Sequence, residues 1–595
     1  MTAKGNELLA LAGILLCSSS WVSAVNDNSL LWLWQCDSSK ETCSRLANES
    51  NTSADSTLYP SLETCRLVCG KYGALWPQPT IGTELGNKLF TFSVSSVKFI
   101  YPPQEGDVKT YLQEITKLFI NSISAEDTSD CSELTNTVTV NLDVLSENTD
   151  LNWNTSESYS LQIATDGNQN SVKISSNTIF GARHALETLS QLINSYPNND
   201  GSKCLVILEE AKISDVPTYP HRGLLLDTAR NFQSVASIKK HIDGMAYSKL
   251  NVLHWHITDS QSFPLELPKL PNMTKYGAYS ADKIYHPDDV KELVSYAKLR
   301  GVKIIIEIDA PSHSGNGWQW GSNAGLGNLA VCVNQQPHRS YCIQPPCGQL
   351  NPINPKLYEV LKDLYDDIIT MIPKNEVFHM GGDEVYIPCW NSTPEIIDYL
   401  GNKSRTTDTF LDLWSDYQSK ALEAYDAVVG NSNTPIILWT SHLTQVEVIE
   451  KYLPKERYII QTWVPAADNL PQNLLDLGYR IIVSTKDAWY LDHGFWGTTT
   501  YHNWRNVYNN KIPSSDATLG GEACMWGEYV DDSSVESRVW PRAAAVAERL
   551  WTNPTTSDTE AEQRFYRHRE RLVSRGIKAE ALIPRWCYQN EGECQ

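Results

Sequence analysis

Apolar runs of strand length alternate with amphipathic helical stretches from about residue 219 to the end of the chain. Stretches such as PDDVKELVSYAKLRG and NPKLYEVLKDLYDDIITMI repeat apolar residues with helical spacing. The apolar runs between such stretches are RGLLLDTAR, NVLHWHITD, VKIIIEIDAPSH, VFHMGGDE, PIILWTS, YIIQTW, RIIVSTKDAWYLD and LGGEACMWGE. Continuous apolar runs are typical of strands that are buried on both faces of a parallel sheet. Eight such strand–helix units predict an α/β fold, a (β/α)₈ TIM barrel.

The segment before the barrel has a different pattern, and 595 residues are too many for one ordinary core. Between residues 76 and 215, β-rich runs such as LFTFSVSSVKFI and TVTVNLDVL lead to one helical stretch, FGARHALETLSQLI. Strands followed by a helix predict an α+β domain. Residues 25–75 are polar and rich in cysteine, which is typical of a small disulfide-stapled segment. We therefore place the barrel domain at 216–595, with a disulfide-closed tail at its C-terminus.

The start of the chain indicates export. Residues 1–24 have a lysine near the beginning, the apolar run LLALAGILLC and the sequence VSA before Val25, which is the order of a secretory signal peptide. No later stretch approaches the ~20 consecutive apolar residues of a membrane span, so we expect no membrane anchor. The chain is therefore expected in the secretory pathway, with an extracellular or lysosomal destination. Six N-x-S/T sequons agree with this, at Asn48, Asn51, Asn154, Asn272, Asn391 and Asn402.

Export also makes disulfides the default state of closely spaced cysteines. Spacing alone does not fix their connectivity. Thirteen cysteines follow the predicted signal peptide, an odd number, and we expect Cys524 to stay reduced and buried. The candidates for pairing are Cys36/Cys43 with Cys65/Cys69, Cys342/Cys347 and Cys587/Cys594.

Charge and aromatic content narrow the class of ligand. A formal net charge of -21 opposes binding to nucleic acid or to an anionic membrane. The 19 tryptophans offer flat faces that suit stacking on a sugar ring. The active site of such a barrel lies at the C-terminal ends of its strands, and a pocket of aromatic and acidic residues there suits a neutral sugar. The residues at the ends of the runs are Asp227, Arg230, His256, Asp259, Asp309, His313, Asp383, Glu384, Trp439, Trp463, Tyr490, Asp492, Trp526 and Glu528.

The adjacent carboxylates Asp383 and Glu384 restrict the reaction. Neighbours on a strand cannot stand ~5–9 Å apart on either side of a glycosidic bond, as ordinary glycosidase pairs do, unless the backbone turns sharply. If the sugar carries a 2-acetamido group, however, its own carbonyl oxygen attacks the anomeric carbon, and the protein need supply only one acid. The second carboxylate then orients the acetamido N–H and stabilises the developing positive charge. Gly381 and Gly382 allow the backbone to turn there without a Cβ clash.

A metal centre is an alternative interpretation of the strand ends. His254 and His256 form an H-x-H pair, as in some barrel metallohydrolases. That interpretation needs further His or carboxylate ligands on later strands, and the runs ILWTS, IIQTW and CMWGE offer no His. We therefore predict no metal and no cofactor, and we expect His254 to lie in the core.

The motifs themselves resemble a known family. They are HMGGDEV, HRGLLLDTAR, LHWHITDSQSFP, IDAPSHSG, ILWTS, YLDHG and GGEACMWGEYVD. Over about 219–580 they resemble the catalytic domain of glycoside hydrolase family 20, the β-N-acetylhexosaminidases, and the preceding α+β region is similar to that family's non-catalytic domain. The stretch from GGEACMWGEYVD to WPRAAAVAERLW resembles lysosomal hexosaminidase chains. The segments CRLVCGKYGALWPQP, PPCGQLNP and WCYQN resemble arthropod chitinolytic members.

The resemblance implies an exo-acting enzyme that hydrolyses terminal, nonreducing β-linked GlcNAc or GalNAc by a retaining, substrate-assisted mechanism. It implies that Glu384 is the general acid/base, with a pKa raised by burial beside ionised Asp383. Asp383 is expected to hold the acetamido nitrogen and Tyr490 the acetamido oxygen. His313 and Asp259 match a relay that orients and tunes Glu384.

Sugar-binding residues are implied in the same way. Arg230 is expected to bind the 3- and 4-hydroxyls, and Asp492 with Glu528 the 4- and 6-hydroxyls. The expected walls around the nonreducing sugar are Trp439, Trp463 and Trp526.

Two questions stay open at this level. A barrel of this type can lose catalysis and become a lectin-like sugar-binding protein, although the presence of Glu384, Asp383 and Tyr490 favours the enzyme. The natural substrate is also open, because chitooligosaccharides, N-glycans and glycolipids end in the same sugar. The expected partners are this carbohydrate and a second copy of the chain, as a homodimer.

Overall fold

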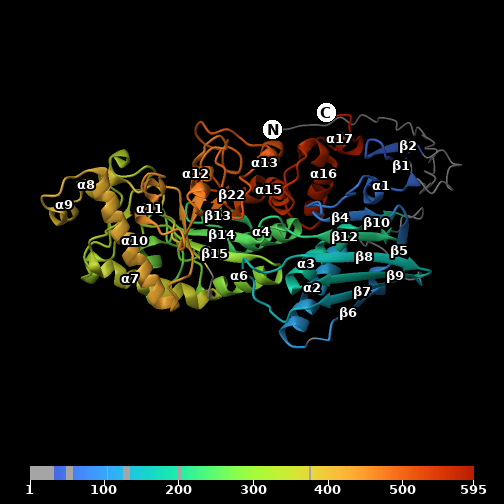
Figure 1. Ribbon diagram of the computed structural model, residues 1–595, viewed down its shortest axis with the longest axis horizontal. Coiled ribbons are helices and arrows are strands. Elements are labelled where there is room, and N and C mark those ends of the chain that lie inside the picture. The colour runs from blue at the N-terminus through green and yellow to red at the C-terminus, as the bar shows by residue number, and fades with distance from the viewer. Residues whose placement is uncertain are drawn as a thin grey trace, which may run out of the picture.

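The computed structural model describes residues 32–47, 58–103, 105–124, 135–197, 203–373 and 377–594. The predicted signal peptide at 1–24 and the sequons at Asn48 and Asn51 lie outside these residues. The described chain forms a barrel, coloured green to orange, beside an N-terminal domain built on a sheet, coloured blue to cyan (Figure 1). The C-terminal helices, in red, lie alongside both parts.

Eight parallel strands close the barrel in chain order, which confirms the predicted (β/α)₈ fold. The last strand pairs in parallel with the first, with Leu224 opposite Ala523. The strands are β13 (His221–Asp227), β14 (Val252–Thr258), β15 (Lys303–Ile308), β18 (Phe378–His379), β19 (Ile436–Trp439), β20 (Tyr458–Thr462), β21 (Arg480–Val483) and β22 (Thr518–Met525). Every residue of β13 and β14 is buried, which explains why their runs are continuously apolar apart from site residues.

Amphipathic helices surround the barrel. Helix α7 is representative: Asn354 caps it by accepting from the Lys356 backbone N–H, and Leu357, Leu361 and Leu364 share its buried face. The helices after the strands are α4 (Val235–Ser248), α5 (Asn272–Gly277), α6 (Pro287–Leu299), α7 (Pro355–Met371), α8 (Ile387–Ser392), α9 (Pro394–Leu400), α10 (Thr407–Val429), α11 (Ile449–Tyr452), α12 (Leu470–Asp476), α13 (Trp504–Asn509), α14 (Val535–Val539) and α15 (Arg542–Trp551). Helices α16 (Asp558–Ser574) and α17 (Arg585–Gln589) follow, and a small hairpin of β16 (Ala330–Val331) and β17 (Gln349–Leu350) lies between β15 and α7.

The N-terminal domain is α+β, as predicted. Its main sheet has the order β4 (Gly82–Leu85), β12 (Ala211–Asp215), β8 (Tyr159–Asp166), β9 (Gln169–Ser176), β7 (Thr137–Val144) and β6 (Val97–Ile100). A second sheet joins β10 (Ile193–Pro197), β11 (Lys203–Leu208) and β5 (Leu89–Phe92). Helices α2 (Asp107–Ser124) and α3 (Ile179–Gln191) pack against each other, and α3 also packs on the main sheet.

Buried polar contacts join this domain to the barrel. Helix α3 is buried along its whole length, and its Arg183 donates to the backbone carbonyl of Ala246 at 2.7 Å. The buried Arg222 guanidinium lies 2.6 Å from the carboxylate of Glu157. Pairing of this kind makes separation of the two parts costly, because each group would leave a partner unpaired in a buried place.

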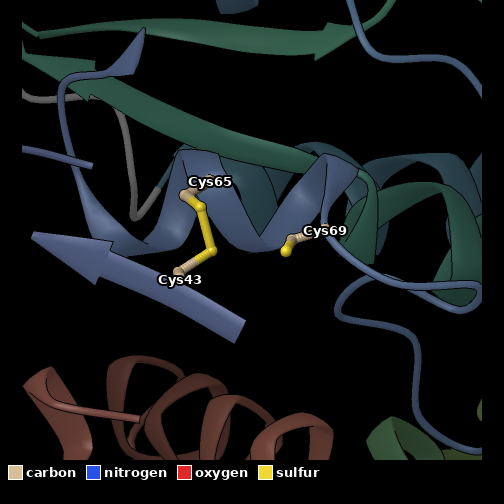
Figure 2. A group of neighbouring side chains, drawn as sticks. All are labelled: Cys43, Cys65 and Cys69. Atoms are coloured by element: carbon tan, nitrogen blue, oxygen red, sulfur yellow. A yellow bond between two sulfur atoms is a disulfide. The ribbon is translucent and has the colours of Figure 1, made fainter. Parts of the chain in front are cut away.

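Two disulfides staple the N-terminal segment. Strands β1 (Trp32–Asp37), β2 (Thr42–Ala47) and β3 (Leu58–Tyr59) form a small sheet beside helix α1 (Leu62–Val68). Figure 2 shows Cys43 on β2 bonded to Cys65 on α1, with Cys69 one helical turn further on. Cys69 is bonded to Cys36. Each bond therefore joins one cysteine of the first predicted pair to one of the second.

Of the other described cysteines, Cys204 lies on β11 of the N-terminal domain and is disulfide-bonded, and the rest are in the barrel domain. The predicted pairs Cys342–Cys347 and Cys587–Cys594 are both bonded, and Cys524 is free and buried as expected. A further disulfide, Cys332–Cys389, was not predicted. No helix in the part of the chain that the structure describes combines the length and apolar character needed to cross a bilayer.

Candidate active site

A cavity of about 570 Å³ opens at the C-terminal ends of the barrel strands. Of the predicted site residues, only Asp259 and Trp439 do not line it. Gln344, Trp496 and Lys486 also line it, and sequence reasoning did not select them. The predicted residues on its wall are Arg230, His313, Asp383, Glu384, Trp463, Tyr490, Asp492, Trp526 and Glu528.

The backbone after β18 leaves the strand geometry within two residues. Gly381 and Gly382 have φ of 61° and 92°, a region that favours glycine. A Cβ at Gly381 would lie 1.9 Å from Oδ1 of Asp309, so a side chain there has no room. The same Asp309 oxygen accepts from the Gly382 backbone N–H at 2.9 Å. Glu384 itself has φ of 50°, which is uncommon for a residue with a side chain.

This turn places both carboxylates beside one histidine. Nε2 of His313 lies 3.4 Å from Oε2 of Glu384 and 3.8 Å from Oδ2 of Asp383. Adjacent residues that would point to opposite faces of a strand therefore reach the same cavity. The predicted role of the glycines, a sharp turn without a Cβ clash, agrees with this geometry.

His313 connects Glu384 to a buried carboxylate. Its Nδ1 lies 3.2 Å from Oδ1 of Asp259, and Oδ2 of Asp259 lies 2.9 Å from Nη2 of Arg230. The His313 side chain is 8% exposed, and Asp259 is buried behind the cavity wall. The predicted Asp259–His313–Glu384 relay is thus present as a continuous set of contacts.

The carboxyl groups around His313 favour its charged form. Burial disfavours its charged form, but Asp259, Asp309 and Asp383 raise its pKa well above the usual value. Burial also raises the pKa of Glu384, yet the hydrogen bond and charge of His313 outweigh burial, so the net shift is downward. The expectation of a raised Glu384 pKa is therefore wrong for the unliganded chain, because sequence reasoning considered Asp383 and omitted the His313 charge. The pKa of Asp383 is raised instead, chiefly by burial.

Arg230 is held from three sides. Its guanidinium contacts Asp227 at 3.0 Å and Asp259 at 2.9 Å, and it donates to Oε1 of Gln344 at 3.0 Å. The Gln344 amide in turn donates to Oε1 of Glu528 at 2.8 Å. Gln344 lies within the Cys342–Cys347 loop, and this disulfide loop after a barrel strand is the sequence signal that could have indicated it.

Several buried polar atoms of the wall have no hydrogen-bond partner within the protein. They belong to residues on different strands that face one cavity, and buried polar groups normally have partners. Asp492 has one such oxygen, while its other oxygen accepts from Trp496 at 2.9 Å. A polyol ligand supplies the missing partners. The atoms are Oδ1 of Asp383, Oδ1 of Asp492, Nε1 of Trp526 and Oε2 of Glu528.

Comparison with known families identifies this arrangement. The model of the glycosyl hydrolase family 20 catalytic domain matches residues 219–554. The chain belongs to glycoside hydrolase family 20. A second family 20 model, described as beta-acetyl hexosaminidase like, matches residues 75–192 in the N-terminal domain.

Relatives within family 20 extend over nearly the whole chain. A chitooligosaccharidolytic beta-N-acetylglucosaminidase of Ostrinia furnacalis is 41% identical over 96% of this chain and 97% of its own. The beta-hexosaminidase subunit beta of Mus musculus is 35% identical over 70% of this chain and 74% of its own. The solved Flavobacterium johnsoniae chitobiase has a TM-score of 0.66 and 26% identity, covering 85% of this chain and 73% of that one.

The tryptophans of this family 20 cavity differ in exposure. Trp463 and Trp526 line the cavity, and the Arg230 guanidinium stacks 5.2 Å from the Trp526 ring centroid. Trp439 is only 1% exposed and lies behind Trp526, with 5.9 Å between the ring centroids. Its indole N–H donates to Glu307 at 2.7 Å.

One group of residues in the barrel core has part of the geometry that a metal site needs. His254, Glu307 and His379 lie close enough together to share an ion. The Nδ1 atoms of both histidines have hydrogen-bond partners: that of His254 lies 2.9 Å from Glu522, and that of His379 accepts from the Gly381 N–H at 3.0 Å. Nε2 of His254 lies 3.0 Å from the Glu307 carboxylate as an ion pair. His254 is buried as predicted, and these contacts fit a hydrogen-bonded barrel core rather than a metal site of this family 20 chain.

Proposed function

We propose that the chain removes terminal, nonreducing β-linked GlcNAc or GalNAc with Glu384 as its general acid/base. The enzyme class follows from the family: the chain is an exo-acting β-N-acetylhexosaminidase that works by substrate-assisted catalysis. The observation that supports the role of Glu384 is its position beside Asp383 and His313 in the same cavity. Two carboxylates on the same side of the cavity suit a pair in which one is the acid and the other binds the acetamido group. A nucleophile and an acid would instead stand on opposite sides of the sugar.

In the first step the acetamido oxygen of the bound sugar attacks the anomeric carbon, while the bond to the leaving oxygen breaks. Glu384 gives its proton to that oxygen, and Asp383 accepts a hydrogen bond from the acetamido N–H. Tyr490 donates its phenol O–H to the acetamido oxygen. Water then opens the oxazolinium ring after losing a proton to Glu384, which restores the acid and retains the configuration.

The proton needed by Glu384 is available beside it. The Glu384 side chain is 25% exposed in the empty cavity, and a bound sugar removes water from it. Desolvation raises the pKa of a carboxyl group, so substrate binding favours transfer of a proton from His313 to Glu384. His313 and Asp259 are therefore proposed to tune the acid rather than to touch the sugar.

The remaining wall residues bind the sugar itself. Arg230 is proposed to donate to the 3- and 4-hydroxyls, while Asp492 and Glu528 accept from the 4- and 6-hydroxyls. Their partnerless buried oxygens support this assignment. The aromatic wall consists of Trp463 and Trp526, with Trp439 packed behind them.

The biological setting is inferred from the relatives and the sequence. We propose chitooligosaccharides as substrates, because the Ostrinia furnacalis and Bombyx mori relatives are named chitooligosaccharidolytic and match 96% of this chain. N-glycan and glycolipid ends carry the same sugar and are alternatives. An exported glycoprotein, extracellular or lysosomal, that forms a homodimer is consistent with the leader and the sequons.

Replacing the acid tests the assignment. Glu384→Gln keeps the shape but cannot donate a proton, so kcat on chitobiose should fall by about 10²–10⁴. A substrate with a very good leaving group, 2,4-dinitrophenyl GlcNAc, needs less protonation and should lose less. Glu395→Gln changes a half-buried carboxylate that does not line the cavity, so it is the control and should match the wild type on both substrates.

Equal losses on both substrates would contradict the acid role of Glu384. A wild-type chain that binds N-acetylglucosamine without any turnover would instead support the inactive sugar-binding alternative.

A further inference from the structure

A row of buried histidines and carboxylates runs through the interior of the barrel to the proposed acid. Its deep part lies on β14, β15 and β22, and we call it the core chain: Glu522, His254, Glu307 and His256. Glu522 lies 2.9 Å from His254, and Nε2 of His254 lies 3.0 Å from Glu307. Glu307 lies 2.6 Å from Nδ1 of His256.

The core chain ends directly on the relay behind the acid. Nε2 of His256 lies 2.9 Å from Oδ2 of Asp259, whose other oxygen contacts His313. The four side chains of the core chain are about 1% exposed or less. None of them lines the cavity, so none touches a bound sugar.

We propose that His256 and Glu307 are positioning residues, which set the orientation and the proton affinity of the His313–Glu384 pair from inside the barrel. The proposal rests on the assigned role of Glu384 as the acid. Three features of the core chain support it.

The first feature is geometric. His256 stands between two carboxylates and hydrogen-bonds with both ring nitrogens, to Glu307 at 2.6 Å and to Asp259 at 2.9 Å, which fixes its ring rotation. With His256 held by Glu307, its Nε2–H points at Asp259, and Asp259 in turn holds the Nδ1–H of His313. The Nε2–H of His313 is thereby directed toward Glu384.

The second feature is the alternation of charge. Burial lowers the pKa of His254 and of His256, but the adjacent carboxylates raise them, to about 9 for His254 and well above the usual value for His256. Despite burial, the charged His256 and His254 hold the pKa of Glu307 well below its usual value. Cation and anion therefore alternate along the core chain up to His313.

The third feature is that side branches of the network do not carry this charge. His221, at the far end, contacts Glu522 at 2.6 Å, but burial lowers its pKa and leaves it neutral. His379, beside Glu307, has its pKa lowered to about 3 by burial and is also neutral. The titratable groups that face His256 are Glu307, Asp259, Asp227, Arg230 and Asp309, and those that face Glu307 are His254, His256, His379, Asp309 and Asp383; burial raises the pKa of Asp309 well above its usual value.

The test is the pH dependence of kcat/KM on 4-methylumbelliferyl GlcNAc. The alkaline limb reports loss of the proton shared by His313 and Glu384. His256→Gln removes a cation, so His313 and Glu384 should hold their shared proton more tightly. The alkaline limb should therefore move to higher pH by roughly one unit. Glu307→Gln removes an anion and should move the alkaline limb to lower pH.

His221→Gln is the matched control, because it removes an equally buried histidine from the same network without removing a charge. Its limb should stay at the wild-type position. Circular dichroism checks that each variant folds. If Glu307→Gln does not fold, Glu307→Asp keeps the charge and shortens the reach, and it should lower kcat with the limb unmoved.

Opposite shifts for His256→Gln and Glu307→Gln support the inference. Unmoved limbs, shifts in the same direction, or a shifted limb in Glu307→Asp overturn it. Such results leave the proposed function intact as long as the wild type turns over, whereas an inactive wild type counts against the function itself.

Discussion

At the scale of single residues, Asp492 gives the cavity a charge that depends on pH. Burial raises its pKa to about 7, although the hydrogen bond from Trp496 opposes the shift. The carboxyl is therefore neutral below about pH 7 and ionised above it.

We predict that discrimination against a 6-sulfated substrate increases with pH. Only the ionised Asp492 repels the sulfate, so the ratio of kcat/KM for 4-methylumbelliferyl GlcNAc over its 6-sulfate should rise several-fold between pH 6 and 8. Asp492→Asn should make the ratio independent of pH. Asp487→Asn, which removes a neighbouring carboxylate outside the cavity wall, is the control and should behave as the wild type. A ratio that does not change with pH in the wild type would show that Asp492 does not act on the 6-position of the sugar.

At the scale of elements, the end of β18 determines the site. The strand stops at His379 because Gly381 and Gly382 take positive φ, and this brings Asp383 and Glu384 to one side. Gly381→Ala adds a Cβ 1.9 Å from Asp309, on a backbone that already disfavours side chains.

We expect Gly381→Ala to lower the free energy of unfolding by more than ~3 kcal/mol and to abolish most activity. Gly430→Ala is the matched control, because Gly430 has φ of 70° but nothing within 4 Å of an added Cβ. Gly430→Ala should lower the free energy of unfolding only by the strain of a side chain at positive φ, ~1 kcal/mol, and should leave kcat unchanged. Denaturant unfolding and steady-state kinetics measure both. Equal losses in the two variants would refute the claim that contact with Asp309 shapes the turn.

The elements also show how far sequence reasoning reaches. The barrel strands could be predicted because a strand that is buried on both faces needs a continuous run of apolar residues, as in RGLLLD. The residues of the proposed relay end such runs, but their roles came from the resemblance to family 20. Gln344 was missed: the disulfide loop could have indicated it, but its contact with Arg230 spans 114 positions and depends on how that loop folds back over the cavity. The Glu384 pKa was missed for a related reason: it depends on the charge of His313, which local sequence does not reveal.

At the scale of the whole molecule, the barrel domain holds the entire candidate active site. The N-terminal domain packs on the barrel through buried ion pairs, and the residues that line the cavity all come from the barrel domain. The proposed roles give the cavity an acid, a residue that binds the acetamido group and residues that bind hydroxyl groups, and no carboxylate is assigned as a nucleophile. The central claim is therefore that the nucleophile belongs to the substrate.

The most direct test of this claim is a series of aryl glucosaminides whose N-acetyl group carries zero, one, two or three fluorines. Fluorine withdraws electrons from the amide oxygen and weakens it as a nucleophile, while the leaving group stays the same. The account predicts that kcat/KM of the wild type falls steeply with each added fluorine. A rate that does not change across the series, or a covalent sugar trapped on any Asp or Glu, would contradict it.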